Sequence, residues 1–188
     1  MTIVHVAEGI MEETARLLTS FAAAAESEGV VYWFGLELGE LAVVTTLIVP
    51  DADTSTGAVQ TSAAVNAEAI GAVAGTPLVL LGQAHSHPSR WVGHSSVDDR
   101  DTFAQFPGAL SVVVPYYGRH GMELASCGVH RHIEGTYRRI RDTDVEEHLR
   151  VLPGVRDMRD RTRPQGRRRS GWLERLRLVF KGGRNEDR

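Results

Sequence analysis

The sequence predicts an α/β or α+β domain over about residues 1–140, followed by a basic extension over residues 141–188. Up to about residue 140, short stretches rich in β-branched and aromatic residues alternate with stretches of helical periodicity, as in a sheet flanked by helices. The balance of charge then changes sign. Residues 1–137 carry 5 Arg against 15 Asp and Glu, whereas residues 138–188 carry 15 Arg and one Lys against 9 acids. We therefore expect an acidic body with a basic appendage.

In the first half of the domain, apolar periodicity and turn residues define the elements. Apolar residues recur at helical spacing after Gly9, and two apolar runs around Gly39 and Glu40 predict a hairpin. Gly75 and Pro77 end an Ala-rich helical stretch. In chain order we expect a strand at residues 4–6, a helix at 9–25, strands at 30–38 and 41–49, a polar loop at 50–56 and a helix at 63–74.

The same signals predict the elements of the second half and of the extension. Thr143 and Glu146 have the spacing of a capping box, which predicts a short helix there. The extension continues with a linker rich in Arg, Gly and Pro, and then with an apolar stripe of 3.6-residue period flanked by basic residues. In chain order we expect a strand at residues 78–84, a helix at 96–105, strands at 109–115 and 122–130, a linker at 153–170 and an amphipathic helix at 171–181.

Composition excludes several classes of protein. No apolar run approaches the roughly 20 residues that span a bilayer, so we expect no transmembrane segment. The N-terminal residues are acidic and mixed, unlike a secretory signal. Cys127 is the only cysteine, which excludes an internal disulfide framework and a zinc site built from several thiolates. These features are typical of a cytoplasmic protein.

The residues that carry chemistry lie in one short stretch, with His85, His87 and Asp98 as the candidate metal ligands. His85 and His87 are two apart at the end of a strand, where alternate residues face one side. Asp98 lies in the first turn of the following helix, where side chains lean back toward the N-terminus and can aim at the two histidines. Two imidazoles and a carboxylate leave one tetrahedral position of a single Zn²⁺ ion open, as in a catalytic site. Ser95 precedes that helix and is placed to donate a hydrogen bond to an oxyanion.

This stretch resembles the JAMM metallopeptidase family, also called MPN-plus or JAB. The family motif is an upstream Glu, then His-(Ser/Thr)-His-Pro, then a Ser separated from the second His by seven residues and an Asp separated from that Ser by two. The sequence His85-Ser-His-Pro88, Ser95 and Asp98 matches it without a spacing error. The resemblance implies a curved mixed sheet flanked by helices, a zinc cofactor, and Glu28 as the general base, with Glu26 as the alternative. At the following strand the sequence departs from the family pattern, because Val-Val stands where a Cys-Gly pair is usual.

The resemblance is to bacterial members that are associated with ubiquitin-like conjugation. It implies a zinc-dependent isopeptidase or peptidase that cleaves after the C-terminal tail of a ubiquitin-like protein, in precursor processing or deconjugation. The implied partners are that ubiquitin-like substrate and E1-like and E2-like proteins of the same pathway. Two alternatives stay open, namely a peptidase that trims a sulfur-carrier protein and a non-catalytic scaffold module.

The neighbouring residues admit less specific interpretations. Trp91 either lines the channel for a substrate tail or only packs the loop. We expect His94 to shape the loop through a hydrogen bond, and Cys127 to be a small buried residue. His130 and His132 share a strand face and are expected to be exposed. For the basic extension we favour docking on protein over binding a membrane surface, and we expect no nucleic acid because no recognition motif is present.

Overall fold

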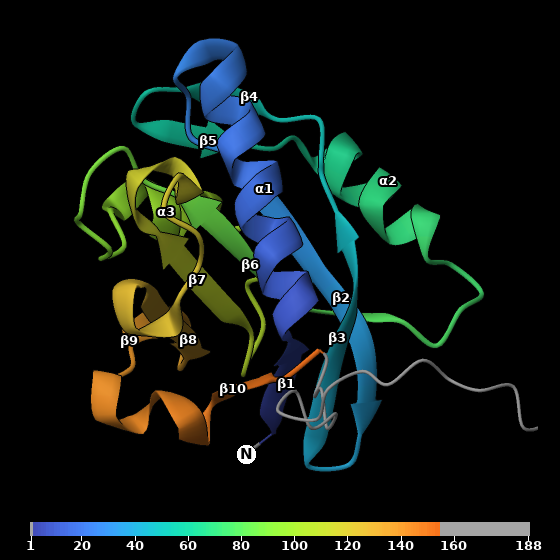
Figure 1. Cartoon of the computed structure of the whole chain (residues 1–188). Coiled ribbons are helices and arrows are strands. Elements are labelled where there is room, and N and C mark those ends of the chain that lie inside the picture. Colours follow the sequence, from blue (N-terminus) through green and yellow to red (C-terminus); the bar gives the residue numbers. More distant parts are fainter. Residues whose placement is uncertain (1, 155–188) are drawn as a thin grey trace, which may run out of the picture. The chain divides into compact units, whose positions relative to one another are not determined.

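The computed structural model describes residues 2–154, which form a mixed eight-stranded sheet with helices on both faces (Figure 1). The strand order is β10-β1-β3-β2-β6-β7-β8-β9. The strands are β1 (Ile3–Ala7), β2 (Val30–Leu38), β3 (Leu41–Ile48), β6 (Val79–Ser86), β7 (Leu110–Val114), β8 (Gly128–Ile133), β9 (Thr136–Arg139) and β10 (Leu149–Leu152). The pairs β1–β3, β1–β10 and β6–β7 are parallel, and the other pairs of this sheet are antiparallel. The expected curved mixed sheet flanked by helices is confirmed.

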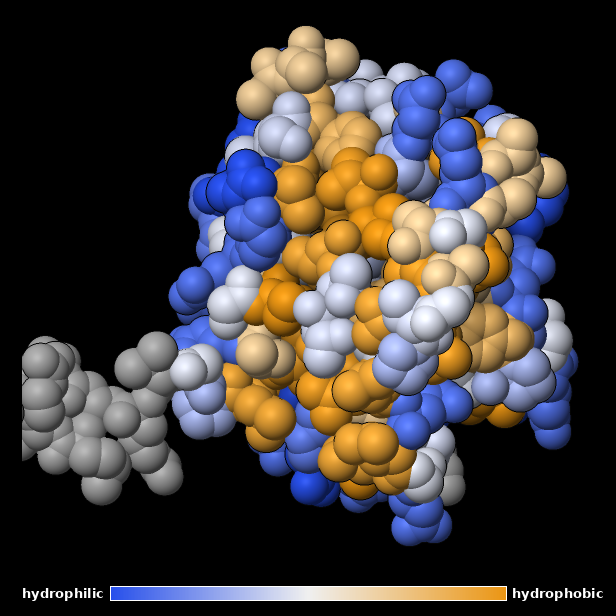
Figure 2. All heavy atoms as spheres, turned by 90° about the vertical axis from the view of Figure 1, so that its right-hand side faces the viewer, coloured by the Kyte–Doolittle hydropathy of each residue, from blue (hydrophilic) through white to orange (hydrophobic). Residues whose placement is uncertain are grey.

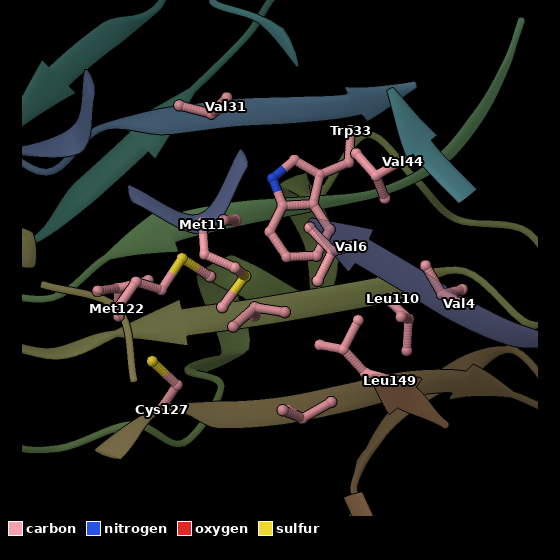
Figure 3. Packing of buried hydrophobic residues seen from close by; sticks show 14 of the residues in the cluster. Val4, Val6, Met11, Val31, Trp33, Val44, Leu110, Met122, Cys127 and Leu149 are labelled. Atoms are coloured by element: carbon pink, nitrogen blue, oxygen red, sulfur yellow. The ribbon is translucent and has the colours of Figure 1, made fainter. Parts of the chain in front are cut away.

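Helix α1 (Glu8–Ala25) covers one face of the sheet and builds the larger core. Its apolar stripe packs on the inward side chains of the central strands, because residues at helical spacing share one face. Trp33 is fully buried, lies beside Val6 and Val44 (Figure 3), and donates its indole N–H to Thr14 Oγ1 at 3.2 Å. Cys127 is a free thiol in the same core, as expected.

Helix α2 (Ala63–Ala72) lies on the opposite face and builds a smaller core. Tyr32 and Phe34 of β2 pack with Ala69 and Val73 there. Apolar residues gather on the surface on this side of the molecule (Figure 2). Three large apolar residues are at least 40% exposed on these elements, namely Leu38 at the end of β2, Ile70 on α2 and Val79 at the start of β6.

The structure differs from the sequence prediction in the short polar elements. The expected loop at residues 50–56 contains β4 (Asp53–Ser55), which pairs with β5 (Ala58–Gln60) in a separate hairpin. Three-residue strands of polar composition carry no apolar alternation from which to predict them. Helix α3 (Ser96–Asp101) ends earlier than expected, because Thr102 turns to extended geometry and the Phe103 ring packs on Tyr32 at 4.9 Å.

The body also extends past residue 140. A 3-10 helix over Asp142–Glu147 occupies the position of the expected short helix. Strand β10 then returns to pair with β1, with Val4 opposite Leu149. This pairing joins residues about 145 positions apart, which local periodicity cannot reveal. The rest of the extension, with the expected linker and amphipathic helix, lies outside the described residues. Among residues 2–154, no helix is long and apolar enough to cross a membrane.

Candidate metal centre

Strand β6 places the two motif histidines in the middle of the sheet. His85 pairs with Val30 of β2 on one side and with Val113 of β7 on the other. The backbone N–H of His87 continues the parallel ladder by donating to the carbonyl of Val114 at 2.9 Å. The two histidines are only 1% and 4% exposed, and they lie two positions apart in extended backbone, so both imidazoles face the same side.

The side chains of His85, His87 and Asp98 converge with the spacing of ligands around one ion. The two Nε2 atoms are 3.2 Å apart, and Asp98 lies 3.6 Å from His85 Nε2 through Oδ1 and 3.5 Å from His87 Nε2 through Oδ2. Ligands bound to tetrahedral zinc at 2.0–2.1 Å are separated by about 3.3 Å. Among the described residues these three form the cluster that could hold a metal ion.

The hydrogen bonds and charges of the cluster also fit a cation. His87 Nδ1 lies 2.9 Å from the carbonyl oxygen of Trp91, which only accepts, so Nδ1 carries the hydrogen and the Nε2 lone pair faces the cluster. Burial alone would lower the pKa of His87, yet the carboxylates of Asp98 and Glu28 raise it. The pocket therefore favours positive charge, as a site for a divalent ion requires.

Asp98 is held in place by the start of α3. Its Oδ2 accepts the backbone N–H of Ser95 at 2.6 Å, and Ser95 Oγ accepts the backbone N–H of Asp98 at 3.1 Å, which completes a capping box. Although burial opposes ionisation, the bonds to His85, His87 and the Ser95 backbone hold the pKa of Asp98 well below its usual range. Asp98 is therefore a carboxylate with a fixed orientation, and the Ser95 hydroxyl hydrogen is left free to donate.

Glu28 lies opposite His87 at the end of the antiparallel β2–β6 pair. Past Val30 the ladder continues, because Gly29 N–H donates to Ser86 Oγ and Ser86 N–H donates to the Gly29 carbonyl, both at 3.0 Å. Extending this register by one step would pair Glu28 with His87, while the Glu28 backbone N–H donates to the Ser55 carbonyl at 2.8 Å. Glu28 is 3% exposed, and burial raises its pKa to about 7.

Glu26, the alternative base, lies in a different environment. It ends α1 in the left-handed region with φ of 49° and is exposed. The charge on Glu28, by contrast, is close enough to interact with both His87 and Asp98. The geometry thus favours Glu28 over Glu26 as the carboxyl group nearest the cluster.

Trp91 covers the outer side of His87. The indole stacks on the imidazole with ring centroids 5.0 Å apart and an interplanar angle of 14°, and the side chain remains 53% exposed. Gly93 lets the loop close around it, since a Cβ at this position would lie 2.8 Å from the indole. Trp91 thus packs the loop and also presents an apolar surface beside the cluster.

His94 lies in the loop before α3 and belongs to a second layer of rings behind the cluster. It bonds to Asp99 and to Ser111, as expected of a residue that shapes the loop. Burial lowers the pKa of His94 to about 4 and that of His130 to about 3, so both are neutral near pH 7. The prediction that His130 and His132 are exposed is wrong, since they are 2% and 8% exposed.

The reason for this burial is the β8–β9 pairing. Tyr137 of β9 faces His132 and covers this row of rings, with ring centroids 5.2 Å apart. Ser111, which bonds to His94, was not among the site residues predicted from the sequence. Its one signal was a lone hydroxyl residue in an otherwise apolar strand.

A cleft leads from the cluster to the surface. Its inner part, about 20 Å³, is lined by both His85 and Asp98. It adjoins a wider hollow of about 460 Å³ that shares Thr61, Asp101 and Phe103 with it. The inner part has room for about one water molecule, and the outer hollow is open to solvent.

No family model matches this chain. The probable metalloprotease y4jG of Sinorhizobium fredii is 43% identical over 54 residues, which is 29% of this chain and about a third (33%) of that relative. The solution structure of protein DSY2949 from Desulfitobacterium hafniense aligns with a TM-score of 0.61 at 16% identity, over 81% of this chain and 95% of that one. The JAB1/MPN domain protein AF2198 from Archaeoglobus fulgidus aligns with a TM-score of 0.41 at 16% identity, over 81% and 97%.

The resemblance drawn from the motif agrees with the curated relative, whose printed name is that of a probable metalloprotease. At 16% identity, the likeness to DSY2949 establishes the fold alone.

Proposed function

We propose that this chain is a JAMM-type zinc peptidase that cleaves after the C-terminal tail of a ubiquitin-like protein. The observation that carries the proposal is the convergence of His85, His87 and Asp98 at ligand spacing, with the buried carboxyl group of Glu28 opposite His87. A structural zinc site would be closed by four protein ligands, whereas three ligands leave a position open for chemistry.

In this proposal His85, His87 and Asp98 hold the metal. When bound, zinc supplies Lewis-acid chemistry, since it polarises a peptide carbonyl and lowers the pKa of water to about 7. Glu28 takes the proton from the attacking water and passes it to the leaving amine. In the metal-free chain burial raises the pKa of Glu28 to about 7, so this carboxyl group can both take up and release a proton near neutral pH.

Ser95 and Trp91 are assigned to the substrate. The Ser95 hydroxyl, whose oxygen already accepts from Asp98 N–H, donates its free hydrogen to the developing oxyanion. The exposed face of Trp91 packs against the substrate chain next to the scissile bond. The tail of such a substrate, in extended conformation, would reach the cluster from the side of Trp91. We further propose E1-like and E2-like proteins of a bacterial pathway as partners.

The test is cleavage of a ubiquitin-like protein fused to a short C-terminal extension. The zinc-loaded full chain should release the extension, and EDTA should abolish release until zinc is restored. Glu28→Gln should lower the rate by about 10²–10⁴-fold while zinc stays bound, because it removes only the proton acceptor. Glu26→Gln, two residues earlier and exposed, is the matched control and should retain the rate.

The substrate panel separates the alternatives. Cleavage confined to a sulfur-carrier precursor would keep the peptidase and replace its substrate. A chain that binds no zinc and cleaves neither fusion would be a scaffold module, and the proposal would be withdrawn.

A further inference from the structure

His94 lies between the two halves of the motif, which assigns it no role. Its side chain is 4% exposed. Nδ1 lies 2.9 Å from Asp99 Oδ1, and Nε2 lies 2.9 Å from Ser111 Oγ. A carboxylate only accepts, so Nδ1 carries the hydrogen and Nε2 accepts the hydroxyl hydrogen of Ser111. The imidazole is therefore fixed from both sides, by α3 and by β7.

This order of groups is that of a hydrolytic Ser-His-Asp triad, but it cannot act as one here. Ser111 is fully buried in β7, between Gln83 of β6 and His130 of β8. A substrate carbonyl cannot reach Oγ through the sheet, and a nucleophile must touch its substrate. The hydrogen bonds from Asp99 and Ser111 instead fix the position of the His94 imidazole.

The His94 imidazole, which these hydrogen bonds hold, lies against the imidazole of His85. The edge of one ring meets the other, with the centroids of His94 and His85 5.5 Å apart. On its other side His94 packs against His130 at 4.2 Å and Tyr137 at 4.9 Å, so it cannot move away.

The two candidate ligands differ in how they are oriented. His87 donates its second N–H to the Trp91 carbonyl. His85 Nδ1 is buried and has no hydrogen-bond partner among residues 2–154. Metal-binding histidines almost always gain their orientation from such a second bond. For His85 the orientation must come from packing, and His94 is a fixed group that packs against it.

We propose that His94 is a positioning residue, fixed by Asp99 and Ser111, that orients His85 toward the metal. The inference rests on the metal centre of the proposed function. It adds a residue outside the motif on which metal affinity depends.

The experiment measures zinc affinity of the full chain by competition with a chromophoric chelator, together with the visible spectrum of the cobalt(II)-substituted protein. His94→Ala should weaken zinc binding by about 10–100-fold, the usual effect of losing such a support. The cobalt spectrum should change with it, because its intensity reports ligand geometry. His132→Ala is the matched control. This substitution also removes a buried imidazole, one that packs against Tyr137. It should keep the zinc affinity within about threefold of that of the unaltered chain.

A second pair of variants tests the hydrogen bond without opening a cavity. Asp99→Asn and Asp99→Ala remove the same charge from a side chain that is 43% exposed, but only alanine removes the acceptor for His94 Nδ1–H. Asp99→Ala should weaken zinc binding and Asp99→Asn should largely preserve it. This pair decides the matter if His94→Ala does not fold.

Three outcomes would overturn the inference. They are unchanged zinc affinity and cobalt spectrum in His94→Ala, an equal loss in His132→Ala, and equal affinities in the two Asp99 variants. The unaltered chain is measured first. If it binds no zinc, the proposed function itself fails, whereas full zinc binding by His94→Ala removes this inference alone.

Discussion

At the scale of single residues, Asp98 connects the two histidines of the cluster with the N-terminus of α3. One carboxylate accepts from the Ser95 backbone and faces both imidazoles. Because its pKa lies well below the usual range, Asp98 is ionised near neutral pH. A ligand that is charged and fixed before the metal arrives loses little freedom on binding.

Ser95 has two separable tasks, so its replacement has two measurable effects. Ser95→Ala should lower the cleavage rate by about 10²–10³-fold through the lost oxyanion donor. It should also lower the free energy of unfolding by about 1 kcal/mol through the lost cap. Ser95→Thr keeps a hydroxyl and should largely restore both. Activity of the alanine variant within a few-fold of the unaltered chain would remove Ser95 from the chemistry.

Glu28 should make the metal-free protein less stable as pH rises. Its folded-state pKa of about 7 lies above its ordinary value of 4.5, so the native state holds the proton more tightly. The resulting stabilisation is fully present below pH 4.5 and is lost as pH rises through 7. In EDTA at pH 8, Glu28→Gln should therefore be more stable than the unaltered chain by on the order of 1–3 kcal/mol.

The measurement is denaturant unfolding of both proteins at pH 4.5 and at pH 8, with Glu26→Gln as the control. The increase in the free energy of unfolding caused by Glu28→Gln should be larger at pH 8 than at pH 4.5. A difference that does not change with pH would mean that Glu28 is not held in a desolvated site.

At the scale of elements, the close approach of β6 and β7 sets the position of His85. A Cβ on Gly82 would lie in contact with the backbone carbonyl of Leu110, so only glycine fits. Gly82→Ala should destabilise the fold by about 1–3 kcal/mol and weaken zinc binding by moving β6. Gly9→Ala is the control, since nothing lies within 4 Å of its added Cβ on α1, and it should stabilise by up to about 1 kcal/mol. Thermal unfolding and zinc titration of both variants check this, and an unaffected Gly82→Ala would contradict it.

Elements with strong local signals could be predicted from the sequence. The α1 periodicity, the β2–β3 hairpin and the buried strand before His85 each depend on neighbours in the chain. The β4–β5 hairpin and β10 could not be predicted. The strands of the β4–β5 hairpin are too short and polar to show an alternation of apolar residues. Strand β10 depends on its pairing with β1, which lies far away in the sequence.

The candidate site was predictable to the extent that it is local. His85, His87, Ser95 and Asp98 lie within 14 residues of one another, and their spacing brings them together once the strand and helix are known. The layer behind them was not predictable. Ser111 comes from a different strand, and the burial of His130 depends on long-range pairing.

At the scale of the whole molecule, charge is divided between two parts of the sequence. Residues 1–154 carry 9 basic and 19 acidic residues, and residues 155–188 carry 12 basic and 5 acidic residues. The candidate metal ligands and the proposed base all lie in the acidic part, which forms a compact unit of its own. The proposed site is thus built from residues of this part.

A chain that ends at Gly154 should fold and bind zinc like the full chain. The net charge of this fragment is −10, against −3 for the whole sequence, so it should elute later from an anion-exchange column. Circular dichroism and metal analysis check the prediction. Loss of zinc binding in a folded fragment would show that residues 155–188 contribute to the site.

The most direct test of the central claim is a crystal structure of the zinc-loaded chain with anomalous diffraction at the zinc absorption edge. We predict one strong peak within about 2.0–2.2 Å of His85 Nε2, His87 Nε2 and an Asp98 carboxylate oxygen. We also predict that the Glu28 carboxyl group lies within reach of one water from the ion. A peak elsewhere, or an Asp98 side chain turned away from the two histidines, would contradict the account.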